Sequence, residues 1–185
     1  MRNRIENLKQ RSRLVHSIRV HFHDRAYTEI QAPCVVDVPS IEPHIDPLQV
    51  LDDGGRTRYL HTSPEYALKK LLARGLGDCF SLGPCFRDEP SSDHHAAEFT
   101  MLEWYSTNRS LFDLMDETES LIRSVWQTLG SPEVIREGSS LDLEGDFERR
   151  SVSSLFKSIL GFCPIELGRF DLLEAKVREL SLIHI

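Results

Sequence analysis

The chain has 185 residues, of which 40% are hydrophobic and 28% charged, a composition typical of a globular protein with a single core. It contains no apolar run long enough for a membrane helix, and it opens on polar residues without the apolar segment of a secretory signal. Asp and Glu outnumber Lys and Arg by 29 to 22, for a formal net charge of −7. Because nucleic-acid binding needs Lys and Arg at the phosphates, this balance argues mildly against a tRNA-binding module and not at all against ATP binding.

The cysteines give no sign of a metal site. Cys34, Cys79, Cys85 and Cys163 form no C-x-x-C pair and have no closely spaced histidine partner. We therefore expect free thiols in a reducing cytoplasm and no metal ligand within this chain.

Four elements are predicted in the first 75 residues. Apolar residues follow helical spacing within residues 11–25. Alternation over residues 28–33 indicates a short strand that Pro33 ends. Residues 58–61 form a second candidate strand. A helix is then expected over residues 62–73, with a hydroxyl at its cap and a proline in its first turn, before two glycines end it.

A strand pair and an amphipathic helix give the clearest patterns. We predict strands over residues 79–87 and 98–105, joined by the polar loop 88–97. The helix follows over residues 110–129, where one apolar stripe runs along its length. Ser110 and an acid three residues later resemble a capping box.

The rest of the chain is predicted to be a connection and a helical region. Residues 131–150 are acidic and rich in turn formers, which indicates a surface connection, and helices are expected over residues 151–160 and 172–180. Antiparallel strands with segregated helices make the predicted fold class α+β. We expect one domain over residues 1–130 and the start of a helical insertion over residues 151–185.

The last six residues differ from what precedes them. Residues 180–185 carry neither a capping nor a terminating signal after a charged helical pattern. We expect that the natural reading frame is cut near this point and that these residues are foreign to it.

The chemistry of the sequence is concentrated in the two central strands. Side chains two apart share one face of a strand, so Arg87 can point with Glu89, and Glu103 with Tyr105. A guanidinium suits the α-phosphate of a nucleotide because it is always charged and offers a planar fork of donors. Carboxylates suit ammonium groups. The pattern therefore predicts one pocket in which an arginine meets a nucleotide and acids hold an amine.

Plainer interpretations of the same residues stay open. Arg87 can form an ordinary surface ion pair with Asp88 or Glu89, which contributes about 0–1 kcal/mol. Glu103 lies in an otherwise apolar stretch, where an unpaired buried carboxylate is costly. It must face a polar pocket or find a partner in the core, and its spacing does not choose between these.

The strand pair resembles motif 2 of the class II aminoacyl-tRNA synthetases, and residues 7–129 resemble the lysine branch of that family. Within the branch, the sequence is most similar to the elongation factor P β-lysine ligases. Thr62-Ser63-Pro64-Glu65-Tyr66 and Glu103-Trp104-Tyr105 have the ligase wording. The first helix also begins almost at Met1, so, if this N-terminus is native, we expect no N-terminal anticodon-binding domain.

The resemblance implies a role for each matching residue. It implies that ATP contacts Arg87, Asp88, Glu89, His95 and Ala96, with Arg87 acting as the catalytic residue on the α-phosphate. It implies that the amino-acid substrate contacts Ser63, Pro64, Glu65, Glu103 and Tyr105. It also implies that Pro33 lies at a homodimer interface and that Phe99 packs beneath the site. Without the family, Ser63 and Glu65 are a helix cap and a favoured first-turn acid, His95 is a solvated loop residue, and Pro33 merely ends a strand.

The sequence also departs from the family pattern. Ala96 and Ala97 replace the Asn-Pro usual after this histidine, and the hairpin loop lacks an arginine of some relatives. Nothing after Arg150 resembles motif 3, which carries a second ATP-binding arginine. The Mg²⁺ ligands are also expected beyond this chain. We therefore expect the chain by itself to hold half an active site and to be inactive.

The function implied by the resemblance is ATP-dependent activation of lysine or (R)-β-lysine as an aminoacyl-adenylate, followed by transfer to a lysine of elongation factor P. The enzyme is expected to be a cytoplasmic homodimer that does not use tRNA or a membrane. One alternative is a lysyl-tRNA synthetase, and another is a non-catalytic synthetase-like binding protein. An aspartyl- or asparaginyl-type enzyme is disfavoured because Glu65 and Glu103 suit a cationic substrate.

Overall fold

The computed structural model describes residues 4–39, 41–89, 92 and 95–179. The fold is α+β, as the sequence predicts. The chain divides into two compact units, Met1–Leu141 and Asp142–Ile185, and each is described by itself. The assignment of residues 1–130, 131–150 and 151–185 to a catalytic part, a connection and an insertion stays a prediction.

The centre of the first unit is a three-stranded sheet in the order β1-β5-β6. β1 (Thr28–Glu29) runs parallel to β5 (Cys79–Phe86), and β5 pairs antiparallel with β6 (Glu98–Tyr105) over its whole length. The pairing sets Ser81 opposite Glu103. The two long strands are those predicted from the sequence, except that β5 ends one residue earlier.

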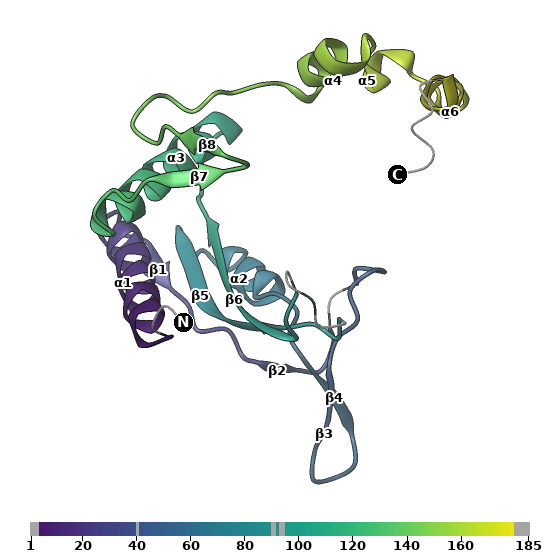
Figure 1. The fold of residues 1–185 in the computed structure, drawn as a ribbon. Helices are drawn as coiled ribbons and strands as arrows, with labels where there is room; N and C mark the ends of the chain where they lie inside the picture. Colours follow the sequence, from purple (N-terminus) through teal and green to yellow (C-terminus); the bar gives the residue numbers. More distant parts are fainter. Residues whose placement is uncertain (1–3, 40, 90–91, 93–94, 180–185) are drawn as a thin grey trace. The chain divides into compact units, whose positions relative to one another are not determined.

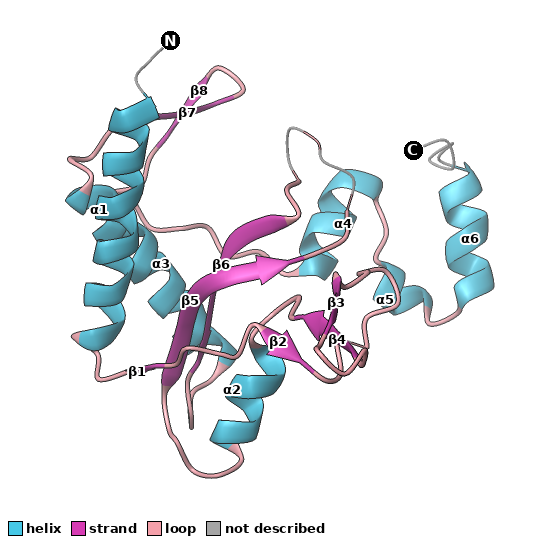
Figure 2. Cartoon of the chain, turned by 90° about the horizontal axis from the view of Figure 1, so that it is seen from below, coloured by secondary structure: helices cyan, strands magenta, loops and turns pink. Residues whose placement is uncertain are grey.

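Helices cover both faces of this sheet. α1 (Arg4–His23) and α3 (Leu111–Thr128) lie side by side on one face (Figure 1). Aromatic residues dominate the core between them and the sheet, and the rings of Phe22 and Phe80 stack with their centroids 4.8 Å apart. α2 (Glu65–Leu72) packs on the opposite face, where Leu68 contacts Cys79 (Figure 2). This face of the strands carries the candidate site.

A second small sheet lies beside the end of β5. Its strands are β2 (Val35–Val36), β4 (Thr57–Leu60) and β3 (Gln49–Leu51), in that order. A backbone bond of 3.1 Å from Phe86 N to His61 O connects it to the end of β5. β4 matches the strand predicted at residues 58–61, shifted by one residue. β2 and β3 are too short to give an alternating pattern in the sequence.

Pro84 lies within β5, although proline cannot donate a bond to a sheet. β1 pairs with β5 at Cys79 and Phe80, and no described strand pairs with that edge of β5 at Pro84. The His61 ring donates from Nε2 to the Pro84 carbonyl across 2.8 Å. Side chains thus replace a neighbouring strand at this edge.

The starts of α3, α2 and α1 agree with the predicted starts to different degrees. α3 has the predicted capping box: Ser110 accepts from Asp113 N, and the Asp113 side chain accepts from Ser110 N. α2 begins at Glu65 with Pro64 at its cap, although Ser63 Oγ still accepts from Glu65 N at 3.0 Å. α1 begins at Arg4 and not near residue 11. Its first turns are exposed and mostly polar, and Ile5 and Leu8 are the apolar residues there, but Arg, Glu and Lys favour helices.

The predicted surface connection contains a hairpin that the sequence analysis missed. β7 (Val134–Arg136) pairs antiparallel with β8 (Ser139–Leu141). Glu137 and Gly138 turn between them with φ of 53° and 80°. This is the left-handed geometry of a two-residue hairpin turn. Asn-Gly or Asp-Gly in the sequence would have indicated this turn, whereas Glu-Gly does not.

The second unit consists of three helices, α4 (Val152–Leu160), α5 (Pro164–Leu167) and α6 (Phe170–Glu179). The first and last correspond to the predicted helices, apart from residue 180, and α5 was not predicted. Lys157 and Glu166 form an ion pair of 2.5 Å between α4 and α5. The tail assigned to a foreign sequence, residues 180–185, lies outside the described residues.

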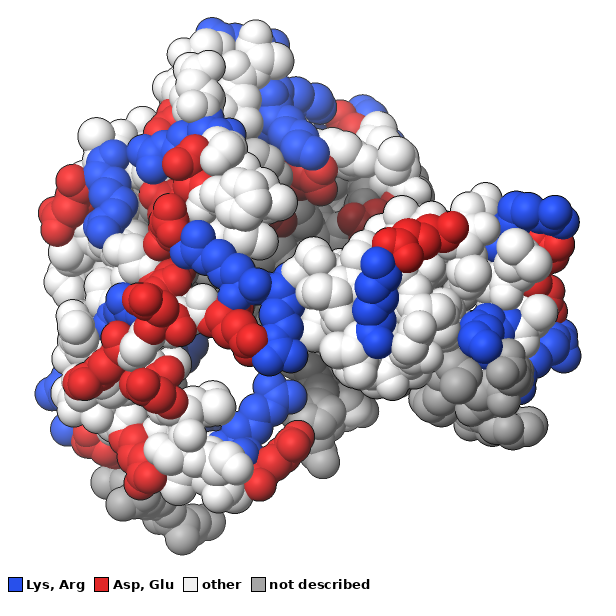
Figure 3. Space-filling model, turned by 90° about the horizontal axis from the view of Figure 1, so that it is seen from above, with Lys and Arg blue, Asp and Glu red and all other residues white. Residues whose placement is uncertain are grey.

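Two further features are the distribution of charge on the surface and the character of the described helices. Acidic and basic side chains are interspersed over the face seen in Figure 3. Among the helices that the structure describes, none combines the length and the apolar character that crossing a bilayer requires.

Candidate functional site

Two hydroxyls bind the carboxylate of Glu103. Ser63, just before α2, donates from Oγ to Glu103 Oε1 at 2.6 Å. Tyr105, two residues along β6, donates from its hydroxyl to Glu103 Oε2 at 3.2 Å. The two-residue spacing on the strand therefore brings Glu103 and Tyr105 together, as predicted. The half-buried Glu103 finds partners, and the distant segment before α2 supplies one of them.

Glu65 is the second carboxylate of this group. Burial raises the pKa of Tyr105, and the negative charges of Glu103 and Glu65 raise it further. Both acids therefore act on the same phenol. Lys69 Nζ lies 2.5 Å from Glu65 Oε1, one turn along α2. The sequence analysis missed Lys69, although its i, i+4 spacing from Glu65 is the signal of a helical ion pair. We call Ser63, Glu65, Lys69, Glu103 and Tyr105 the carboxylate cluster.

Arg87 lies at the other end of the same sheet face. Its backbone N donates to Ala97 O at 3.0 Å, which extends the strand pairing by one residue past β5. The guanidinium Cζ is 5.1 Å from the centre of the Phe99 ring. Arg87 Nε is buried and has no hydrogen-bond partner among the described residues. Phe99 thus supports the guanidinium from below, as the resemblance implies, and leaves a donor unused.

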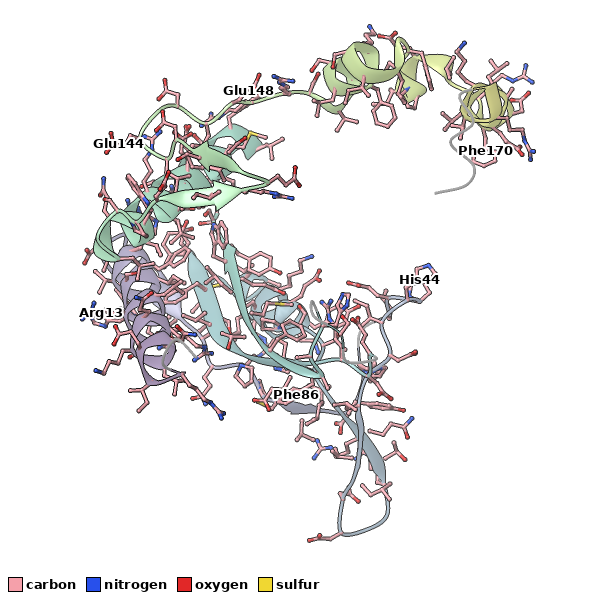
Figure 4. All side chains as sticks on the ribbon, in the orientation of Figure 1. Arg13, His44, Phe86, Glu144, Glu148 and Phe170 are labelled. Carbon is pink, nitrogen blue, oxygen red and sulfur yellow. The ribbon has the colours of Figure 1, made fainter. Side chains whose placement is uncertain are left out.

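The other residues predicted to contact ATP lie near Arg87 in the chain. Asp88 N donates to Asp46 O at 2.8 Å, which ties the hairpin loop to the loop before β3. Glu89 Oε2 lies 3.8 Å from His95 Nε2, and the two form an ion pair when the imidazole is protonated. Ala96 is exposed. Figure 4 labels Phe86 at the end of β5, where these loops meet, and His44 at the outer end of the loop before β3.

Cys85 links the two ends of the face. Burial raises its pKa to about 11, the charge of Glu103 adds to this rise, and the charge of Arg87 opposes it. The thiol therefore lies within the electrostatic reach of both. Phe99 and Glu103 are four residues apart on β6, which corresponds to roughly 13 Å along the strand. Carboxylates and guanidinium are thus at opposite ends of one face.

Two cavities lie beside this face in the described part of the chain. One, of about 590 Å³, is lined by Arg19, Cys34, His61, Pro64 and Cys85 among others. The other, of about 750 Å³, is lined by Pro33, Val35, Arg58, Ser63, Glu65 and Tyr66 among others. Neither is lined by Arg87, Glu89 or Glu103. The single pocket predicted for arginine and acids stays a prediction.

The last two predictions for the site concern Pro33 and metal binding. Pro33 is exposed and lines the larger cavity. Among residues 4–39, 41–89, 92 and 95–179, no three His, Cys, Asp or Glu side chains are grouped as a metal ion would require.

Comparison with known proteins places these residues in context. The family described as tRNA synthetases class II (D, K and N) matches residues 2–178. An elongation factor P–(R)-β-lysine ligase of Yersinia enterocolitica is 34% identical over 179 residues, which cover 94% of this chain and 50% of that protein. The ligase of the same name from Vibrio vulnificus is 32% identical over 179 residues, with the same coverage of 94% and 50%.

A third relative matches a shorter stretch more closely. The ligase of the same name from Salmonella paratyphi B is 39% identical over 126 residues, which cover 65% of this chain and 39% of that protein. The chain thus spans about half the length of the curated relatives that match most of it.

Proposed function

The chain belongs to the class II tRNA synthetases of the D, K and N type, and on this premise we propose that it forms part of an ATP-dependent ligase. The ligase activates lysine or (R)-β-lysine and transfers it to a lysine of elongation factor P. Support comes from the printed names of the relatives, which are ligases of this kind. The carboxylate cluster is the single structural observation that carries the proposal.

The cluster supports an amine substrate because it already holds an ammonium. Lys69 Nζ sits on Glu65 Oε1 at 2.5 Å, so this geometry suits a cation of the same chemistry. Ser63 and Tyr105 donate to Glu103, one to each oxygen. A carboxylate oxygen accepts two hydrogen bonds, so each Glu103 oxygen keeps acceptor capacity for a ligand ammonium.

Arg87 is assigned to the α-phosphate of ATP. Its buried Nε lacks a partner, and leaving a buried donor unpaired costs about 1–3 kcal/mol. A phosphate oxygen satisfies such a donor with a charge-assisted bond. Phe99 holds the guanidinium plane from below, which limits its reorientation when the nucleotide binds. Glu89 and His95 are assigned to the same nucleotide on their place in the hairpin, next to Arg87.

The proposed reaction has two steps. The carboxylate of the amino acid attacks the α-phosphorus of ATP, the bond to the β-phosphate oxygen breaks, and pyrophosphate leaves. The amine of a lysine on elongation factor P then attacks the adenylate carbonyl, AMP leaves and an amide forms. This chain contributes by holding the amine at Glu65 and Glu103 and by stabilising phosphate charge at Arg87. Mg²⁺ neutralises phosphate charge in such ligases, and we assign its ligands to no described residue of this chain.

Pro33 is assigned to a homodimer interface. It is exposed just before β2, and it lines one cavity together with the exposed apolar residues Val35 and Ile41. Apolar residues exposed together are typical of surfaces that bind another protein. Sedimentation equilibrium tests this part of the proposal, because a monomer at micromolar concentration contradicts it.

The function is tested on a protein that contains this sequence and spans the length of the relatives. We expect ATP–pyrophosphate exchange that depends on lysine or (R)-β-lysine, and labelling of elongation factor P by the activated amino acid. Labelling of tRNA(Lys) in its place identifies a lysyl-tRNA synthetase. Binding of lysine without exchange identifies a non-catalytic binding protein, and absence of lysine binding contradicts the proposal.

A further inference from the structure

Lys69 occupies the carboxylate that the proposed function reserves for the substrate. It lies in α2 one turn after Glu65, and its Nζ is 2.5 Å from Glu65 Oε1. Its side chain is 56% exposed and that of Glu65 is 38% exposed. The pair is therefore at the surface of the cluster, and the flexible lysine stem can swing into solvent without disturbing the core.

The ammonium of Lys69 interacts with more than its ion-pair partner. The hydrogen bond and the charge of Glu65 raise the pKa of Lys69, and the charge of Glu103 adds to the rise. Glu65 and Glu103 also act together on Tyr105. Lys69 is thus the cation of a group with two carboxylates, and it is a primary ammonium, like the amine of the proposed substrate.

We propose that Lys69 is an internal counter-ion that competes with the substrate ammonium for Glu65, so that it sets the affinity and the charge selectivity of the cluster. This inference rests on the proposed function, because it needs Glu65 to take the amine. Binding exchanges one ammonium for another at Glu65 Oε1, and Lys69 moves to solvent. A ligand without an ammonium cannot make this exchange.

The expected strength of the competition between Lys69 and the substrate ammonium follows from the type of ion pair that Lys69 forms with Glu65. Exposed i, i+4 ion pairs are weak, and their loss changes an equilibrium about twofold. The second carboxylate strengthens the hold on Lys69, which sets an upper range of about fivefold. Removing the Lys69 ammonium should therefore tighten binding of a cationic ligand by about two- to fivefold, and salt should shrink the difference.

The experiment uses a protein that contains this sequence and spans the length of the relatives, and it compares lysine binding to this parent and to three variants by isothermal titration calorimetry at low salt. Lys69→Met removes the ammonium, Lys69→Arg keeps a cation, and Lys9→Met is the matched control. Lys9 is also an exposed helical lysine paired with an acid, Glu6, at 3.8 Å in α1. We expect two- to fivefold tighter binding for Lys69→Met, and values near the parent chain for Lys69→Arg and Lys9→Met. Hexanoate, which lacks an ammonium, should show no gain.

The outcomes separate this inference from the function on which it rests. If the parent chain binds lysine and Lys69→Met binds it equally or more weakly, the inference is wrong and the proposed function stands. An equal gain for hexanoate or for Lys9→Met also overturns the inference, because it reveals a general effect of net charge. If no variant binds lysine, both proposals fail.

Discussion

Two glutamates of this unit have the same kinds of partner and different surroundings. Glu103 accepts from Ser63 and Tyr105 at 2.6 and 3.2 Å. Glu117, in α3 on the opposite side of the sheet, accepts from Tyr27 and Ser106 at 2.6 and 3.1 Å. Each carboxylate thus receives one phenol and one serine hydroxyl.

The distribution of those bonds differs. Both hydroxyls of the Glu117 group donate to Oε2, while Oε1 has no hydrogen-bond partner among the described residues and lies 4.0 Å from Arg109. The Glu117 side chain is 3% exposed, whereas Glu103 is half-buried and has one donor on each oxygen. A buried carboxylate with its partners inside the core contributes to stability, while a half-buried one with spare acceptors can bind a ligand. Identical partners therefore do not imply identical roles.

The largest expected effect contrasts Arg87, over Phe99 in the candidate site, with Arg109, beside the buried Glu117. In a protein of the relatives' length, Arg87→Ala should lower ATP–pyrophosphate exchange by about 10²–10³-fold, because a donor that stabilises phosphate charge is lost. Arg109→Ala is the control. Arg109 lies 3.7 Å from Asp78 and 4.0 Å from Glu117, on the structural side. If Arg87→Ala and Arg109→Ala lower the exchange rate equally, the assignment of Arg87 to the nucleotide is wrong.

Glu117→Ala tests the structural role of the buried carboxylate. It removes the carboxylate that accepts from Tyr27 and Ser106, whose hydroxyls also hydrogen-bond to each other, so we expect the free energy of unfolding to fall by about 3 kcal/mol. Urea denaturation followed by circular dichroism measures it. A change below about 1 kcal/mol would show that Glu117 contributes little to stability.

Glu103→Gln tests the ligand role of the half-buried carboxylate. The amide keeps the shape and one acceptor but loses the charge, so lysine binding should weaken by about 2 kcal/mol, or roughly thirtyfold. The free energy of unfolding should change by less than about 1 kcal/mol. Calorimetric titration and urea denaturation of the same variant give both values, and the opposite ranking would make Glu103 a structural residue.

The smallest effect is a pH dependence at Tyr27. Burial, and a hydrogen bond to Glu117, raise the pKa of Tyr27 to about 12 from the usual 10. The neutral phenol therefore contributes stability that is fully present below pH 10 and is lost as the pH rises to 12. At neutral pH, Tyr27→Phe should cost about 1 kcal/mol. The difference in unfolding free energy between the parent chain and Tyr27→Phe should shrink between pH 10 and 12, and a constant difference contradicts the assignment.

Much of the central fold is predictable because local patterns are strong there. β5 and β6 are eight-residue strands with many apolar residues, and the α3 helix has both an apolar stripe and a capping box. β2 and β7 could not be found in the same way. A strand of two or three residues has no period to detect, and the turn at Glu137 and Gly138 lacks the usual residues.

The candidate site divides in a similar way. Glu103 and Tyr105 share a face because two residues of a strand always do, so the sequence predicts their contact. The partnership of Arg87 with Glu89 was one expectation that spacing allowed, but Glu89 lies beside His95 and Arg87 lies over Phe99. β5 ends at Phe86, and the bond from Arg87 N to Ala97 O extends its pairing with β6 by one residue, so the alignment of Arg87 with Glu89 stays a prediction.

The sequence by itself determined the strand pair, the capped helix and the facing of residues two apart, since all depend on neighbours within a few positions. Only the tertiary structure decided that Ser63 binds Glu103 and that Glu117 is enclosed. Ser63 and Glu103 are 40 positions apart. Such contacts depend on how α2 packs on β5, through Leu68 and Cys79, and on how α3 packs with α1 on the other face. Burial and long-range pairing are properties of the assembled layers, and no local pattern contains them.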